Sequence, residues 1–143
     1  MVNNWRILTF KTEVNMDKEH LKSVIVDQKE LIDTHITSET IIEREGLNQC
    51  FKLIAQPNVL LISGLRRAGK SFFSHILVKN ENYAYANFDD ERLIGFKAEK
   101  LNTLLEVFYE LYGDVTYLLY DEIQNIPGWE LFINSSFAHI SYK

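Results

Sequence analysis

The stretch Gly64-Leu65-Arg66-Arg67-Ala68-Gly69-Lys70-Ser71 decides the fold predicted for this chain of 143 residues. It matches the pattern G-x-x-x-x-G-K-[S/T] in full. Glycine at both ends lets the backbone curl so that successive N–H groups converge on a phosphate. A helix that begins near Gly69 directs the positive end of its dipole to the same place. Lys70 is expected to reach the β- and γ-phosphates, and the Ser71 hydroxyl to bind Mg²⁺.

The context of this loop favours phosphate binding over an incidental surface turn. Asn58–Ser63 is continuously apolar and partly β-branched, which predicts a strand buried on both faces. Lys70–Lys79 reads as a helix, so the loop follows a strand and opens a helix, as the motif requires. Arg66 and Arg67 are expected either to contact phosphate or an acid, or to lie exposed at the loop tip. The residues predicted to contact the nucleotide are Gly64, Leu65, Arg66, Arg67, Ala68, Gly69, Lys70, Ser71 and Phe72.

The rest of the chain predicts alternating helices and strands. Strands are expected at Tyr83–Phe88 and Val115–Tyr120, and between them a helix at Ala98–Tyr112 that Gly113 stops. The order strand, helix, strand, helix, strand predicts an α/β layer fold with parallel strands. Two helices precede it. One opens at Met16-Asp17 with Asp17 as its cap, and one lies around Ser38–Ala55 and is interrupted by Gly46.

Two pairs of acids follow predicted strands. Asp121 and Glu122 come where the strand Val115–Tyr120 emerges, and we expect Asp121 to hold the Mg²⁺ shell and Glu122 to position the attacking water. The alternative is a strand end that meets solvent. Asp89 and Asp90 follow the strand Tyr83–Phe88, and their role stays open between the nucleotide edge and a helix cap with a solvated turn. Trp129, after Pro127-Gly128, is expected to be a packing anchor at a helix start.

Composition excludes several classes of protein. A net charge of -5 gives no general attraction to nucleic acid, and no apolar run is long enough for a membrane span. The first ten residues do not form a secretory signal. The single cysteine, Cys50, fits a reducing interior, so we expect a cytoplasmic protein. The four histidines lack metal-ligand spacing and Cys50 has no partner, so neither zinc nor a thiol nucleophile is expected.

The stretch from about Ile41 to Glu130 resembles the AAA-type ATPase domain of the AAA+ superfamily. Three segments carry the resemblance. They are Leu61-Ile62-Ser63-Gly64-Leu65-Arg66-Arg67-Ala68-Gly69-Lys70-Ser71, Asn87-Phe88-Asp89-Asp90-Glu91-Arg92-Leu93, and Tyr120-Asp121-Glu122-Ile123-Gln124-Asn125 before Pro127-Gly128-Trp129-Glu130. The resemblance implies a P-loop NTPase-like parallel sheet sandwiched by helices. It also implies binding of ATP and Mg²⁺, with Walker A at 64–71 and Walker B ending at Asp121-Glu122.

The sequence departs from the family after Walker B. The next strand, the polar sensor residue, the arginine that reaches the γ-phosphate and the helical lid are not recognisable before Lys143, so we expect a truncated chain whose sheet is incomplete at its C-terminal end. In the AAA+ layout, the missing strand lies between the Walker A and Walker B strands. One alternative is that residues 136–142 occupy the position of the missing strand as a short strand. We expect an N-terminal extension and helix at 1–40 and the partial ATPase domain at 41–143, with the true start open between Met1 and Met16.

The function expected from these residues is a Mg-dependent ATPase domain, or an N-terminal fragment of one, with Glu122 and Lys70 as catalytic residues. Without the γ-phosphate arginine, nucleotide binding is expected to outlast efficient hydrolysis. The alternative is a non-catalytic fragment that binds nucleotide or a protein partner. A small-molecule kinase would use the same loop, although the Asp-Glu strand end argues against it. The resemblance leaves two partners open, a second copy of the chain in a homo-oligomer and a missing C-terminal domain. It also leaves open which process is coupled to ATP hydrolysis.

Overall fold

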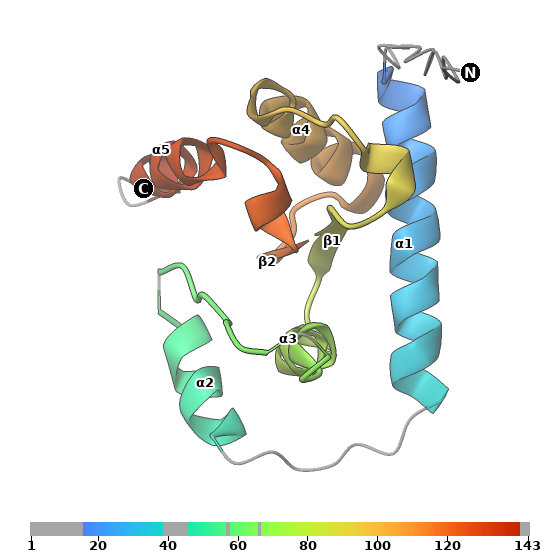
Figure 1. Ribbon diagram of the computed structural model, residues 1–143. Helices are drawn as coiled ribbons and strands as arrows, with labels where there is room; N and C mark the ends of the chain where they lie inside the picture. The colour runs from blue at the N-terminus through green and yellow to red at the C-terminus, as the bar shows by residue number, and fades with distance from the viewer. Residues whose placement is uncertain (1–15, 39–45, 57, 66, 141–143) are drawn as a thin grey trace, which may run out of the picture.

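The computed structural model describes residues 16–38, 46–56, 58–65 and 67–140. They form an α/β fold in which a parallel sheet lies between helices (Figure 1), which confirms the expected fold class. The elements are α1 (Lys18–Ser38), α2 (Leu47–Ile54), α3 (Lys70–Val78), β1 (Tyr83–Asn87), α4 (Leu101–Tyr112), β2 (Tyr117–Asp121) and α5 (Trp129–Ile140), with 3-10 turns at Glu91–Leu93, Ala98–Lys100 and Ile123–Asn125.

The sheet of the described residues consists of β1 and β2, paired in parallel with Tyr85 opposite Leu119 and Asn87 opposite Asp121. Side chains alternate between its two faces. Tyr83, Tyr85 and Leu119 pack with residues of α2 and α3 on one face. The opposite face belongs to the main core, which also takes residues from α1, α4 and α5. Its buried members are Leu21, Val24, Ile25, Ala84, Ala86, Phe88, Leu93, Phe96, Leu101, Leu104, Val107, Phe108, Ile123, Ile126 and Phe132.

The helical periods of the sequence predict most of these elements correctly. α3 lies where it was expected. α4 begins at Leu101, later than the predicted Ala98, because Ala98–Lys100 forms a 3-10 turn, and Gly113 ends α4 with a positive φ of 68°. Trp129 begins α5 and packs against the main core, which confirms the expected anchor. Gly46 precedes α2 with φ 89° and stands at its start. Residues 39–45 lie outside the described part of the chain, so the predicted interruption of a longer helix stays a prediction. None of the described helices combines the length and apolar character that a membrane span needs.

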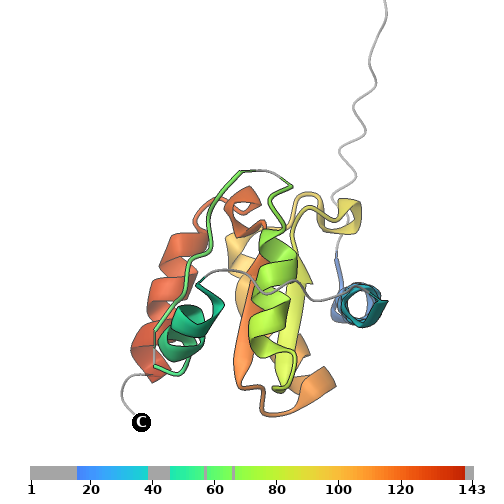
Figure 2. The same ribbon diagram turned by 90° about the horizontal axis from the view of Figure 1, so that it is seen from below.

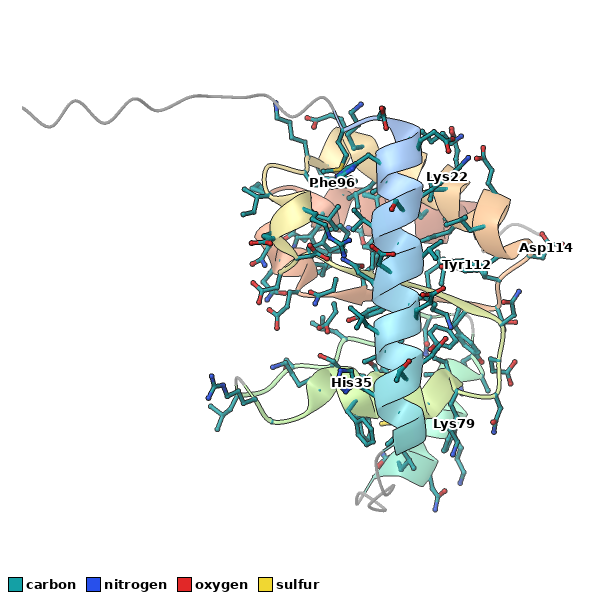
Figure 3. All side chains as sticks on the ribbon, turned by 90° about the vertical axis from the view of Figure 1, so that its right-hand side faces the viewer. Lys22, His35, Lys79, Phe96, Tyr112 and Asp114 are labelled. Atoms are coloured by element: carbon teal, nitrogen blue, oxygen red, sulfur yellow. The ribbon has the colours of Figure 1, made fainter. Side chains whose placement is uncertain are left out.

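Helix α1 runs along the outer edge of β1, and Figure 3 shows it in front of the rest of the molecule, from Lys22 to His35. Asp17 caps it as expected, because its Oδ1 accepts a hydrogen bond from the backbone N–H of His20 at 2.7 Å. Gln28 is 5% exposed and binds the β1 backbone at Asn87. Its Nε2 donates to the Asn87 carbonyl at 3.1 Å, and its Oε1 accepts from the Asn87 N–H at 2.9 Å. The expected domain boundary between residues 40 and 41 falls outside the described residues.

The strand predicted at Asn58–Ser63 is wrong. The described residues 58–65 contain no helix or strand, and Figure 2 shows them as an extended coil separate from the sheet. Val59 is 55% exposed and Leu61 is 70% exposed, so the segment is not buried on both faces. The physical reason is that, among the residues that the structure describes, no strand lies between this segment and β2. A strand needs a neighbour to satisfy its backbone groups, and an apolar run alone does not supply one.

Residues 136–140 do not fill that position as a strand, because they belong to helix α5. The remainder of the suggested strand, 141–142, lies outside the described residues. The chain after β2 therefore forms a 3-10 turn at Ile123–Asn125 and then a helix, both of which satisfy their backbone groups locally. Within the described part of the chain, β2 therefore has a strand neighbour only on its β1 side.

Candidate functional site

The loop between residues 64 and 70 is built by left-handed backbone conformations. Gly69 has φ 74° and ψ 33° at the N-cap of α3, a conformation that glycine adopts without steric cost. Arg67 also has a positive φ, 62°. The Ala68 N–H donates to the Leu65 carbonyl at 3.2 Å and closes a turn, and the Phe73 N–H donates to the Gly69 carbonyl as the helix begins. The first backbone amides of a helix point out of its N-terminal end, so the start of α3 at this loop is a place where an anion can bind.

The side chain of Lys70 folds back over its own loop. Its Nζ donates to the carbonyl oxygens of Gly64 at 3.2 Å and Leu65 at 3.1 Å. The ammonium therefore lies on the concave side of the loop, and a bound phosphate oxygen would compete with these two carbonyls for it. Arg66 lies outside the described residues.

At the end of β2, Asp121 and Glu122 diverge in backbone conformation. Asp121 is the last residue of the strand, while Glu122 has φ 53° and ψ 34°. Among the described residues, Glu122 and Arg67 are the two non-glycine residues with positive φ, and both belong to the predicted site. A non-glycine residue in this region costs about 1 kcal/mol or more, and such residues gather at functional sites. The Glu122 carboxylate accepts a hydrogen bond from Gln124 Nε2.

One pocket of about 400 Å³ joins the loop to the end of the sheet. Three of the residues assigned to the site from the sequence, Gly64, Lys70 and Glu122, line this pocket. Ser71 and Asp121 do not line it, although each is adjacent in sequence to a lining residue, and no hydrogen bond joins the two within the described part of the chain. The lining residues are Leu61, Ile62, Ser63, Gly64, Lys70, Asp89, Glu122, Gln124 and Asn125.

The structure separates the two acids that follow β1. Asp89 lines the pocket, whereas Asp90 faces α1 and caps the turn at Glu91–Leu93. The Asp90 carboxylate accepts hydrogen bonds from Arg92 and from Gln28 Nε2. The Arg92 guanidinium holds the pKa of Asp90 well below its usual range. For Asp90 the capping role is therefore observed.

Several residues near the site were not predicted as site residues from the sequence, and three of them, Leu61, Ile62 and Ser63, line the pocket just before the loop. Gln124 and Asn125 line the pocket, and the Tyr85 hydroxyl donates to Asp121 Oδ2 at 3.4 Å. Burial, followed by the Asp121 charge, raises the pKa of Tyr85 above its usual value. The alternation of Tyr83, Tyr85 and Asn87 in β1 was the available signal, since in a parallel pair it places these side chains on the same face as Asp121.

Comparison with known proteins identifies the family. The family described as "AAA domain" matches residues 56–142. The uncharacterized protein MJ1544 of Methanocaldococcus jannaschii is 30% identical over 117 residues, covering 78% of this chain and 26% of that protein. An uncharacterized protein of Haemophilus influenzae is 29% identical over 108 residues, covering 68% of this chain and 27% of that protein.

The chain thus spans about a quarter of the length of these relatives. No solved structure matches the chain. The match to the AAA domain covers the loop at 64–71, both strands and the acids after β2. The chain belongs to the AAA-type ATPase family and carries its ATPase-like, nucleotide-binding domain.

Proposed function

We propose that this chain binds Mg-ATP between the loop at 64–71 and the end of β2, and that it hydrolyses ATP there. The pocket that joins Lys70 to Glu122 is the observation that carries the proposal. Lys70 and the loop amides would hold the phosphates, with the neighbouring residues 65–69 and Phe72 around the nucleotide. Ser71 and Asp121 would hold Mg²⁺, and Glu122 would orient the attacking water.

The donor chemistry of these residues fits magnesium. Mg²⁺ prefers oxygen ligands and is usually held by one or two carboxylates together with substrate phosphates and waters. The described residues contain no group of three or more His, Cys, Asp or Glu that would form an all-protein metal cage. One carboxylate at Asp121 and one hydroxyl at Ser71 suit an ion that arrives with the nucleotide. Magnesium would neutralise phosphate charge and align the γ-phosphate.

A binding experiment tests the nucleotide site. Mg-ATP at 100 times its Kd should stabilise the wild-type protein by about 2.7 kcal/mol, measured by thermal unfolding. Lys70→Ala should abolish most of this stabilisation. Lys79→Ala is the matched control, since Lys79 is an exposed lysine at the other end of α3. Unchanged ATP affinity and stabilisation in Lys70→Ala would show that the site is assigned wrongly.

A second experiment tests hydrolysis. Multi-turnover phosphate release should be lost in Glu122→Gln while ATP binding remains, and Glu130→Gln, an exposed glutamate of α5, should behave as wild type. The competing function is a non-catalytic nucleotide-binding module. The position of residues 58–63 outside the sheet favours this binding module. A phosphate loop that is anchored by α3 but not by a preceding strand positions the catalytic groups less precisely, and catalysis depends on that precision. Retained binding without any release in the wild-type protein would support the module.

A further inference from the structure

We propose that Tyr85 is a positioning residue for Asp121, the carboxylate assigned above to magnesium; this inference rests on the proposed function. The Tyr85 hydroxyl donates to Asp121 Oδ2 at 3.4 Å. The strand register explains the contact. Asn87 lies opposite Asp121, so Tyr85, two residues earlier on the same face, is the diagonal neighbour of Asp121. Diagonal neighbours on adjacent strands are within reach of aromatic side chains.

The ring of Tyr85 is held in place from the α3 side. Tyr85 is 5% exposed, and its ring packs edge-on against His75 with 4.5 Å between ring centroids. His75 follows Ser71 by one helical turn, so the two residues share a face of α3. The same packing contact therefore fixes the tyrosine hydroxyl relative to the helix that carries the proposed hydroxyl ligand.

The hydrogen bond orients the carboxylate more than it stabilises the fold. A typical O–H···O distance is about 2.7–2.8 Å, so a separation of 3.4 Å indicates a weak bond. It engages only Oδ2 of Asp121. Oδ1 has no hydrogen-bond partner within the described part of the chain and is available to bind a cation. Partners of this kind, which hold a ligating carboxylate in place, typically change metal affinity by about 10- to 100-fold.

The neighbouring Tyr83 provides a matched control. It lies on the same face of β1, is also 5% exposed, and packs edge-on against the same His75 at 5.6 Å. Its hydroxyl, however, donates to Asp33 Oδ1 of α1 at 2.7 Å. The two tyrosines thus share the contact with His75 and differ in the carboxylate that each hydroxyl holds, while the Tyr83 ring also has Lys29 Nζ 3.9 Å from its centroid.

The experiment compares Tyr85→Phe with Tyr83→Phe in the full chain, using a fluorescent ATP analogue. Affinity is measured in EDTA and across a Mg²⁺ titration, and thermal unfolding reports the stability of each variant. Tyr85→Phe should raise the Mg²⁺ concentration needed for half-maximal enhancement of binding about tenfold, with unchanged affinity in EDTA. Tyr83→Phe should leave the Mg²⁺ requirement unchanged and lower the thermal stability.

An unchanged Mg²⁺ requirement in Tyr85→Phe would overturn the positioning role, and so would an equal shift in both variants, which would indicate a general packing effect. Wild-type protein that binds the analogue without any Mg²⁺ dependence would also refute it, leaving nucleotide binding intact. Failure of the wild-type protein to bind the analogue at all would refute the proposed function itself.

Discussion

His75 should make the stability of this domain sensitive to mild acid. Its side chain in α3 is fully buried, and neither ring nitrogen has a hydrogen-bond partner within the described residues. Its ring instead contacts the edges of Tyr83 and Tyr85. Burial without a partner disfavours the charged imidazolium and lowers the pKa of His75 to about 4, against 6.5 for an exposed histidine.

The sign and size of the effect follow from this difference. The unfolded chain binds a proton near pH 6.5, whereas the folded chain binds it only near pH 4. The stability contributed by neutral His75 is therefore complete above pH 6.5 and is lost as the pH falls from 6.5 to 4. Proton linkage gives a loss of about 2 kcal/mol in the free energy of unfolding between pH 7 and pH 5, and about 3 kcal/mol in total.

Urea unfolding at pH 7, 6 and 5 measures the effect by comparing the wild-type protein with His75→Leu. Over this range the wild type should lose about 2 kcal/mol more than the variant, whatever the variant's stability at pH 7. Asp90 does not interfere, because its lowered pKa places its own acid-dependent loss below pH 4. Equal pH dependence in the wild type and His75→Leu would refute the reasoning.

Two further predictions concern the fold. Gln28→Ala removes two hydrogen bonds to Asn87 and one to Asp90, so urea unfolding should show a loss of about 2–3 kcal/mol; a loss below about 1 kcal/mol would mean that α1 is held by other contacts. Leu61→Ala should change stability by less than about 0.5 kcal/mol because Leu61 is 70% exposed, while Leu104→Ala, at a fully buried position, should cost about 2–5 kcal/mol in the same assay. Comparable losses in the two leucine variants would place Leu61 in a buried strand.

The sequence predicted those elements whose burial is organised locally. The helix face of α1 with Leu21, Val24, Ile25 and Gln28 repeats at helical spacing, so the period alone identifies it. β1 and β2 were found for a similar reason, since each is a short apolar run between turn residues. Asn58–Ser63 has the same appearance and is not a strand, because strand formation also depends on a neighbour that is distant in sequence. Hydrophobicity indicates what a segment can bury, and it carries no information on whether a pairing partner is in place.

The same distinction applies to the site. The loop at 64–71 and the acids after β2 follow from local motifs, and the structure brings Lys70 and Glu122 to one pocket. The contact between Tyr85 and Asp121 depends on the register of two strands, and the one between Gln28 and Asn87 joins residues 59 positions apart. The alternation in β1 indicates which face of the sheet Tyr85 lies on, but the register of the two strands decides which carboxylate its hydroxyl meets. The sequence pattern does not contain that register, so neither long-range hydrogen bond could be predicted from it.

The amide of Gln28 imitates a neighbouring strand. Its donor and acceptor satisfy both outward-facing backbone groups of Asn87, as a further strand would do. At Asn87 the edge of β1 is therefore already paired and covered by α1, so another chain cannot add to the sheet at this position. Within the described residues, no strand pairs with the other side of β2, the strand that carries Asp121.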